Sequence, residues 1–255
     1  MGGLERNLSR ADERCYGHYG SMEEALARSI VTSKQHVAAV LEVVKDWRPR
    51  RVLDIGAGAG AMLRLLSEKG FAQEYAATDL SQLSVSFLNN HPFPGFVGAT
   101  KAGADNLPYE DQSFDLAILS HVLEHVPDPV LTLEEAARVA ARVCFEVPLE
   151  LAFLPTAKAA LITMIWGRIR SINRIGHLHF YCVRCVRDLV RSAGLQMEAH
   201  FRYRIGIEWL NMHFGTGSLN VRIRETFGSV LPINLYGFFF TTHFTALCSK
   251  ASSRS

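Results

Sequence analysis

The chain contains no uninterrupted hydrophobic run long enough to cross a membrane, although 48% of its 255 residues are hydrophobic. Its most apolar stretch, residues 149–166, is broken by Pro155 and Lys158, whereas a spanning helix needs about 20 consecutive apolar residues. The first residues show no apolar core followed by a cleavage site. We therefore expect no transmembrane segment and no secretion signal, while contact of an amphipathic stretch with a membrane surface stays open.

Cysteine and net charge are also scarce. Five cysteines make an odd number in a long chain, which favours reduced thiols and a cytoplasmic protein over a disulfide framework. The formal net charge is only +2, too small to indicate a nucleic-acid groove. Arginines do gather between residues 168 and 191, where we expect a solvated helix surface. A nucleic acid is therefore not the expected partner, and the oligomeric state is left undetermined.

Strand-like and helix-like segments alternate along most of the chain. Helical periodicity, caps and breakers predict helices at 21–47, 61–69, 81–89, 129–141 and 183–193. Short apolar runs predict strands at 51–55, 74–78, 96–98, 114–119, 142–147, 196–205 and 236–249. This alternation is typical of an α/β protein with a doubly wound, mostly parallel sheet in three layers. In such sheets, ligands bind beyond the carboxyl ends of the strands.

A glycine-rich turn follows the first predicted strand. Residues 51–60 read Arg-Val-Leu-Asp-Ile-Gly-Ala-Gly-Ala-Gly, and glycine allows positive φ and close approach of a ligand to the backbone. Asp79 ends the second strand, about 20 residues or slightly more after the turn, where a carboxylate can bind the two hydroxyls of a ribose. A dinucleotide such as NAD is one candidate ligand, but it leaves Gly60 and Asp105 unexplained.

Four segments together resemble the class I S-adenosylmethionine-dependent methyltransferases of the small-molecule type. Residues 52–60 resemble their first motif, and residues 104–115 resemble their run of Asp, Leu-Pro-Phe and Ser-Phe-Asp. Residues 120–129 resemble the segment after their fourth strand, and residues 176–181 resemble their Gly-His-Leu-x-x-Tyr/Phe element. The resemblance implies a seven-stranded Rossmann-like sheet with an antiparallel final strand. It also implies transfer of a methyl group from S-adenosylmethionine to a small-molecule acceptor at O, N or C. The acceptor is expected to be hydrophobic or aromatic if the apolar residues of the insertion at 149–175 line the pocket.

The same resemblance implies a set of cofactor contacts. Asp54 orders the turn and the amino-acid tail of the cofactor, Asp79 binds the ribose, and Asp105 binds the adenine amine. The full expected set is Asp54, Gly56, Ala57, Gly58, Gly60, Asp79, Leu80, Ala104, Asp105 and Ser120. We further expect residues 1–47 to form a helical lid or cap and residues 48–255 to form the methyltransferase domain, with a cap insertion at about 149–176.

His121 is the candidate catalytic residue, because it follows the fourth strand and a histidine can accept a proton near neutral pH. Lining of the strand end is its alternative role. The residues expected to bind the acceptor are aromatic or imidazole side chains from three segments, namely Tyr16, Tyr19, His125, His177, His179 and Tyr181. Methylation of RNA or protein, and a non-catalytic methyltransferase-like partner, are the alternative functions.

Two groups of potential metal ligands stand out. We assign a metal to neither, and a metal at His121, Glu124 and His125 is left undetermined. The run from His121 through Glu124 to His125 is similar to the Glu-x-x-Glu-His element of quinone-type O-methyltransferases, but His121 replaces the first glutamate. His177 and His179 lie close to a single Cys-x-x-Cys pair, at a spacing that does not match zinc fingers.

Overall fold

The computed structural model describes residues 21–149, 177–204 and 242–251, with single positions at 223, 225, 226, 230 and 233. The helices are α2 (Met22–Val44), α3 (Ala61–Glu68), α4 (Gln82–Asn90), α5 (Pro129–Val139) and α7 (Val183–Ser192). The strands are β1 (Arg51–Ile55), β2 (Glu74–Asp79), β3 (Phe96–Lys101), β4 (Phe114–Ser120), β5 (Ala140–Leu149), β6 (Leu195–Arg204) and β7 (Thr242–Lys250). Among these residues, no helix is both long enough and apolar enough to cross a bilayer.

The seven strands form one sheet in the order β3-β2-β1-β4-β5-β7-β6. β1 to β5 pair in parallel, whereas β7 is antiparallel to both of its neighbours, β5 and β6. The predicted doubly wound, seven-stranded sheet with an antiparallel final strand is therefore confirmed. The order reverses between β1 and β4, so the carboxyl ends of these two strands flank the switch point at which ligands bind in such sheets.

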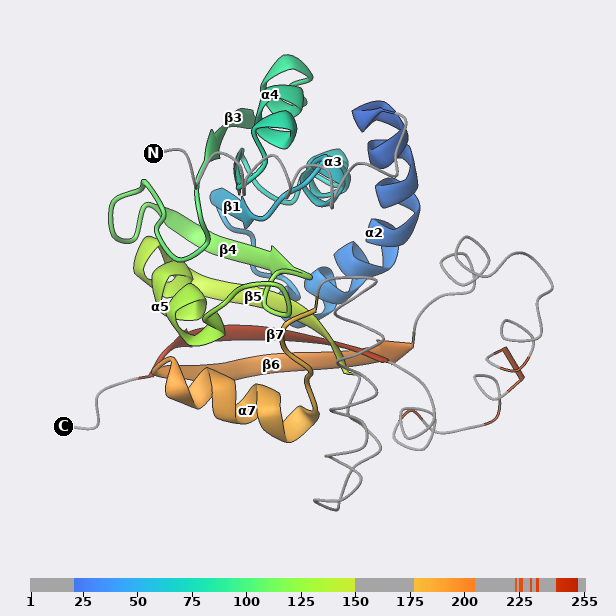
Figure 1. Ribbon diagram of the computed structural model, residues 1–255, viewed down its shortest axis with the longest axis vertical. Coiled ribbons are helices and arrows are strands. Elements are labelled where there is room, and N and C mark those ends of the chain that lie inside the picture. Colours follow the sequence, from blue (N-terminus) through green and yellow to red (C-terminus); the bar gives the residue numbers. More distant parts are fainter. Residues whose placement is uncertain are drawn as a thin grey trace.

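Alternate residues of the strands serve two separate cores. Leu53 of β1 and Phe145 of β5 pack with α5 and α7, whereas Val52 and Cys144 pack with α2, α3 and α4. Figure 1 shows these two groups of helices on opposite faces of the sheet. Because successive side chains of a strand point to opposite faces, Glu146 lies on the same face of β5 as Cys144, toward α2.

Most element boundaries agree with the sequence, and the differences have local causes. The side chain of Ser21 caps α2 as predicted, accepting from the Glu24 amide at 3.2 Å. β5 runs through Pro148 instead of stopping there. Its pairing with β4 ends at Glu146; beyond that point β5 pairs with β7, and Leu149 also forms a single parallel bridge with Tyr181. A residue without an N–H is tolerated where one side of the strand has no partner.

Candidate functional site

The loop after β1 is tied to the end of β2. The amides of Gly56 and Ala57 both donate to the carbonyl of Thr78, at 2.8 and 3.1 Å. The amide of Gly58 donates to Asp79 Oδ2 at 2.8 Å, and the Ser81 amide donates to Asp79 Oδ1 at 2.8 Å. Asp79 therefore fixes the glycine loop on one side and the start of α4 on the other.

Glycine is required in this loop for two physical reasons. Gly56 and Gly60 have φ values of +76° and +81°, which L side chains rarely adopt. A Cβ on Gly60 would lie 2.3 Å from Leu88 Cδ2, and one on Gly56 would lie 2.7 Å from Val122 Cγ2. Leu88 is fully buried in the core, so the loop and α4 fit together only without that methyl group.

Two carboxylates lie close together at the ends of β1 and β2. Asp54 is buried, and its pKa is raised to about 8, first by burial and then by the negative charge of Asp79. A positively charged ligand beside these two acids would relieve both effects. This edge of the sheet is therefore suited to a molecule that carries a cationic group.

The expected adenine side lies after β3. Asp105 is exposed in a short turn closed by the Asn106 amide, which donates to the Gly103 carbonyl at 3.2 Å. Ala104 is half-buried, and Leu80 at the end of β2 is 53% exposed. The Leu80 side chain approaches to 3.9 Å of the position that a Cβ on Gly103 would occupy. An exposed apolar side chain and a carboxylate thus adjoin one another at this end of the sheet.

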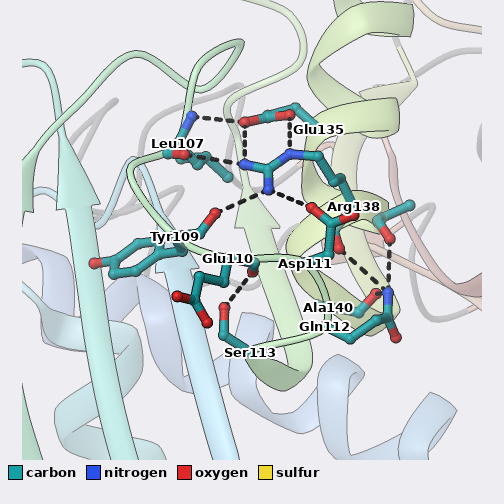
Figure 2. Close-up of polar contacts among 10 residues, drawn as sticks. Leu107, Tyr109, Glu110, Asp111, Gln112, Ser113, Glu135, Arg138 and Ala140 are labelled. Atoms are coloured by element: carbon teal, nitrogen blue, oxygen red, sulfur yellow. Dashed lines mark hydrogen bonds and ion pairs between the residues drawn. The ribbon is translucent and has the colours of Figure 1, made fainter.

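Arg138 of α5 holds the loop that follows Asp105 (Figure 2). Its guanidinium donates to the carbonyls of Leu107 and Tyr109 at 3.0 and 2.8 Å, and to Asp111 at 2.7 Å. Glu135 binds the same guanidinium through both oxygens at 2.8 Å and also accepts from the Leu107 amide at 2.8 Å. The loop is therefore clamped to α5 through its backbone, by an arginine that the sequence reasoning did not single out.

The far end of this loop is tied to β1. Asp115 Oδ2 accepts from the amides of Arg50 and Arg51 at 2.7 and 2.8 Å. The Asp at the end of the 104–115 motif therefore has a structural function at the amino edge of the sheet.

His121 follows β4 in a strained conformation, with a φ of +58°, as residues at functional sites often are. Its Nδ1 lies 2.9 Å from Glu124 Oε1 and its Nε2 lies 3.1 Å from Glu146 Oε1. Burial lowers the pKa of His121, but the hydrogen bonds to the two carboxylates outweigh it and raise that pKa to about 10. Both ring nitrogens of His121 are thus engaged with carboxylates. Ser120, just before it, is half-buried at the end of β4.

Glu146 of β5 is the centre of a buried polar cluster on the α2 side of the sheet. Its Oε1 faces His36 Nδ1 of α2, His121 Nε2 and His243 Nδ1 of β7, the last at 3.4 Å. Its Oε2 accepts from the hydroxyl of Thr245 at 3.1 Å. Burial acts to raise the pKa of Glu146, but the neighbouring histidines hold it well below its usual range. Burial lowers the pKa of His243 to about 4.

The expected acceptor residues at 177–181 pack against the loop after β4. The rings of His125 and His177 meet edge to face at 4.8 Å between centroids. His179 Nε2 lies 2.9 Å from the carbonyl of Val126, and the Tyr181 hydroxyl donates to the Leu123 carbonyl at 2.9 Å. His125 is exposed, whereas His177 and Tyr181 are buried. The segment at 177–181 therefore packs against the loop after β4, and the Tyr181 hydroxyl is bonded to a backbone carbonyl of that loop.

The structure groups the potential metal ligands differently from their order in the sequence. His121, Glu124 and His125 do not converge on one point: His121 joins His36, Glu146 and His243, whereas Glu124 and His125 join His177. The hydrogen bond between His121 and Glu124 links the two clusters. Within the described ranges, neither cluster contains a cysteine.

The Cys-x-x-Cys pair has a local function instead. Cys182 caps α7 and accepts from the Cys185 amide at 3.1 Å. Arg184 and Arg191 on the same helix are exposed and pair with Asp188, as expected for a solvated surface. Tyr16, Tyr19 and the insertion beyond Leu149 up to residue 176 lie outside the described residues.

The cluster around Glu146 was missed because its members are far apart in sequence. His36 lies in the amphipathic helix α2, and Glu146 and His243 lie within apolar strands. The available signal was the polar residue itself: a glutamate inside a run as apolar as residues 143–149 must find partners on its own face of the sheet.

Comparison with known proteins agrees with this geometry. The methyltransferase-domain family matches residues 27–200. Demethylmenaquinone methyltransferase from Mycobacterium sp. (strain KMS) is 28% identical over 180 residues, covering 68% of this chain and 76% of that protein.

Two solved structures share the fold at lower identity. A chain from the complex between the Haloferax volcanii Trm112 methyltransferase activator and a methyltransferase has a TM-score of 0.63 at 17% identity, covering 94% of this chain and 96% of that chain. Geranyl diphosphate C-methyltransferase from Streptomyces coelicolor, in complex with Mg²⁺, geranyl diphosphate and S-adenosyl-L-homocysteine, has a TM-score of 0.57 at 9% identity. It covers 86% of this chain and 81% of that chain.

Proposed function

Because the chain belongs to the methyltransferase-domain family, we propose that it transfers a methyl group from S-adenosylmethionine to a small apolar acceptor with a ring, of the quinol or phenol type. The observation that carries the proposal is the edge of the sheet at β1, β2 and β3, where the glycine loop, two adjoining carboxylates and an exposed apolar side chain meet.

The residues at this edge fit the cofactor group by group. The pKa of Asp54 is raised by burial and by the charge of Asp79, and the positive sulfonium and ammonium groups of S-adenosylmethionine would favour the charged form of this acid. Asp79 is half-buried and already accepts hydrogen bonds through both oxygens, so a ribose would share or replace these donors. Asp105 and Leu80 offer a carboxylate and an apolar surface to a purine.

The acceptor is assigned to the neighbouring end of β4 and β5. His121 and the segment at 177–181 border this region, and His125 and His179 lie beside them. Demethylmenaquinone methyltransferases, by their name, act on a quinone precursor, and the Streptomyces coelicolor enzyme holds geranyl diphosphate. Both acceptors carry a large apolar part, which supports the choice of an apolar acceptor here.

Positioning is the main contribution that the chain can make to this chemistry. The sulfonium of the cofactor supplies an activated methyl group, so the protein must align the acceptor in line with it and exclude water. Since both nitrogens of His121 are bound to carboxylates, we assign this residue to shaping the acceptor side rather than to removing a proton. The described cysteines are free thiols, in keeping with the cytoplasmic location that we propose.

The test is a methyl-transfer assay with S-adenosylmethionine and a panel of acceptors. The panel holds reduced quinones, simple phenols, an RNA oligonucleotide and a basic peptide, and the readouts are S-adenosylhomocysteine release and the mass of the methylated product. We expect product only with the quinols or phenols. Methylation of the RNA or the peptide instead would contradict the acceptor class. Cofactor binding without turnover on any acceptor would favour a non-catalytic function.

A further inference from the structure

We propose that His36, His121, Glu146 and His243 form a binding site for a divalent transition-metal ion, with Zn²⁺ as the expected occupant. The four side chains come from four different parts of the fold: α2, the residue after β4, the centre of β5 and the start of β7. His121 also borders the proposed acceptor region, but the test of the metal site does not depend on the methyl-transfer function.

The distances within the cluster suit a tetrahedral ion. One ligand atom from each residue lies within 4.8 Å of all the others. Glu146 Oε1 is 3.1 Å from His121 Nε2 and 3.4 Å from His243 Nδ1. Zinc bound to nitrogen and oxygen at about 2.0–2.1 Å in a tetrahedron places its ligand atoms about 3.3 Å apart. These two separations match the required size, and the remaining ligand atoms, all within 4.8 Å of one another, would adjust on binding.

Hydrogen bonds alone do not satisfy this cluster well. Three imidazole nitrogens approach the single atom Glu146 Oε1, which has two lone pairs. The Tyr203 hydroxyl lies 3.3 Å from His36 Nδ1 and 3.2 Å from His243 Nδ1, so it adds a further group to the same point. A cation at the centre would accept a lone pair from each of the three nitrogens and from the oxygen.

The surroundings also resemble those of metal sites. His121 uses Nε2 toward the cluster, and its Nδ1 is bound by Glu124 Oε1 at 2.9 Å. A carboxylate on the second nitrogen is the usual way in which a ligating histidine is oriented. Glu146 Oε2 is likewise held by Thr245. His36, Glu146 and His243 are buried, while the His121 side chain is 31% exposed and leaves a route of entry.

The donor set decides the class of ion. Three imidazoles and one carboxylate suit zinc and its neighbours among the later first-row metals, whereas Mg²⁺ and Ca²⁺ prefer oxygen ligands. Four protein ligands leave no open position in a tetrahedral zinc site, as in structural sites. Bound zinc would therefore join α2 to the sheet and stabilise the fold.

The first experiment measures the metal in the whole protein. The chain is stripped with a chelator, titrated with Zn²⁺ against a chromophoric competitor, and melted with and without the ion. We expect one equivalent of zinc per chain and a higher melting temperature with zinc than without. No binding above that of a chain unfolded in denaturant would overturn the proposal.

Substitutions then locate the ion. We expect His36→Gln and His243→Gln each to weaken zinc binding by at least about 100-fold and to abolish the melting-temperature increase. His200→Gln, at an exposed position on β6, is the matched control and should bind like the wild type. His125→Gln tests the neighbouring cluster of Glu124, His125 and His177. Zinc lost in His125→Gln but retained in both cluster variants would refute the site.

A second readout covers the case in which a cluster variant folds poorly. Co²⁺ bound to the wild type should give the strong visible absorption of a four-coordinate ion. Weak absorption typical of six-coordinate cobalt would contradict the proposed ligand set.

Discussion

Replacing Gly60 by alanine tests whether the loop after β1 is fitted to α4. The added methyl group would lie 2.3 Å from Leu88 Cδ2, and the residue would keep a φ of +81°. An L residue in the left-handed region costs about 1–2 kcal/mol, and overpacking a core costs about 1–3 kcal/mol. We expect Gly60→Ala to lower the free energy of unfolding by about 2–5 kcal/mol.

Gly70→Ala is the matched control, because Gly70 has a φ of +60° but no atom within 4 Å of its added Cβ. This variant should lose only the backbone cost, about 1–2 kcal/mol. Thermal and denaturant unfolding of both variants gives the difference. At about 2–4 °C per kcal/mol for a chain of this size, Gly60→Ala should melt several degrees below Gly70→Ala.

The double variant Gly60→Ala/Leu88→Ala separates the clash from other causes. Leu88→Ala alone opens a cavity that costs about 2–5 kcal/mol, but the new methyl group would occupy part of that space. We therefore expect the double variant to be more stable than the sum of the two single changes, by about 1 kcal/mol or more. Strict additivity, or equal losses in Gly60→Ala and Gly70→Ala, would refute the packing argument.

Two further predictions concern the polar groups of the site. Arg138→Met should lower the free energy of unfolding by about 1–2 kcal/mol and weaken S-adenosylmethionine binding measured by calorimetry, because the loop after Asp105 loses its clamp. Arg138→Lys should restore only part of the stability and of the binding. Full binding in Arg138→Met would show that the clamp is not needed. Asp54→Asn should stabilise the ligand-free protein at pH 8 by about 5 kcal/mol and change little at pH 4. The sign follows because the pKa of folded Asp54 is about 8, so the wild type loses stability as the pH rises from about 4 to 8; a pH-independent difference in melting temperature would contradict this.

The sequence predicted the fold because its signals are local. Strand runs such as 51–55 and 114–119, the Ser21 cap and the glycine turn each depend on a few neighbouring residues. Boundaries were less accurate where pairing decides them: β5 continues through Pro148 since β7 supports it. The helix predicted at 129–141 ends at Val139, because Ala140 already pairs with Phe114.

The site was predictable only in part, for the same reason. Asp54 lies one residue before the end of β1 and Asp79 ends β2, and these positions are visible in the sequence. The partners of His121 are not visible, because Glu146 lies 25 residues away on the next strand. The cluster arises from His36 and His243, which a helix and an antiparallel strand bring to one face of the sheet. The role of Arg138 could not be predicted, because its partners are backbone carbonyls of a loop that is distant in sequence.

The most direct test of the account is calorimetric titration with S-adenosylmethionine, S-adenosylhomocysteine and NADH in parallel. The wild type should bind the first two and not NADH. Asp79→Ala should weaken that binding by about 1–3 kcal/mol, whereas Asp46→Ala, exposed before the start of β1, should not. Binding of NADH alone, or unchanged S-adenosylmethionine affinity in Asp79→Ala, would contradict the cofactor site described here.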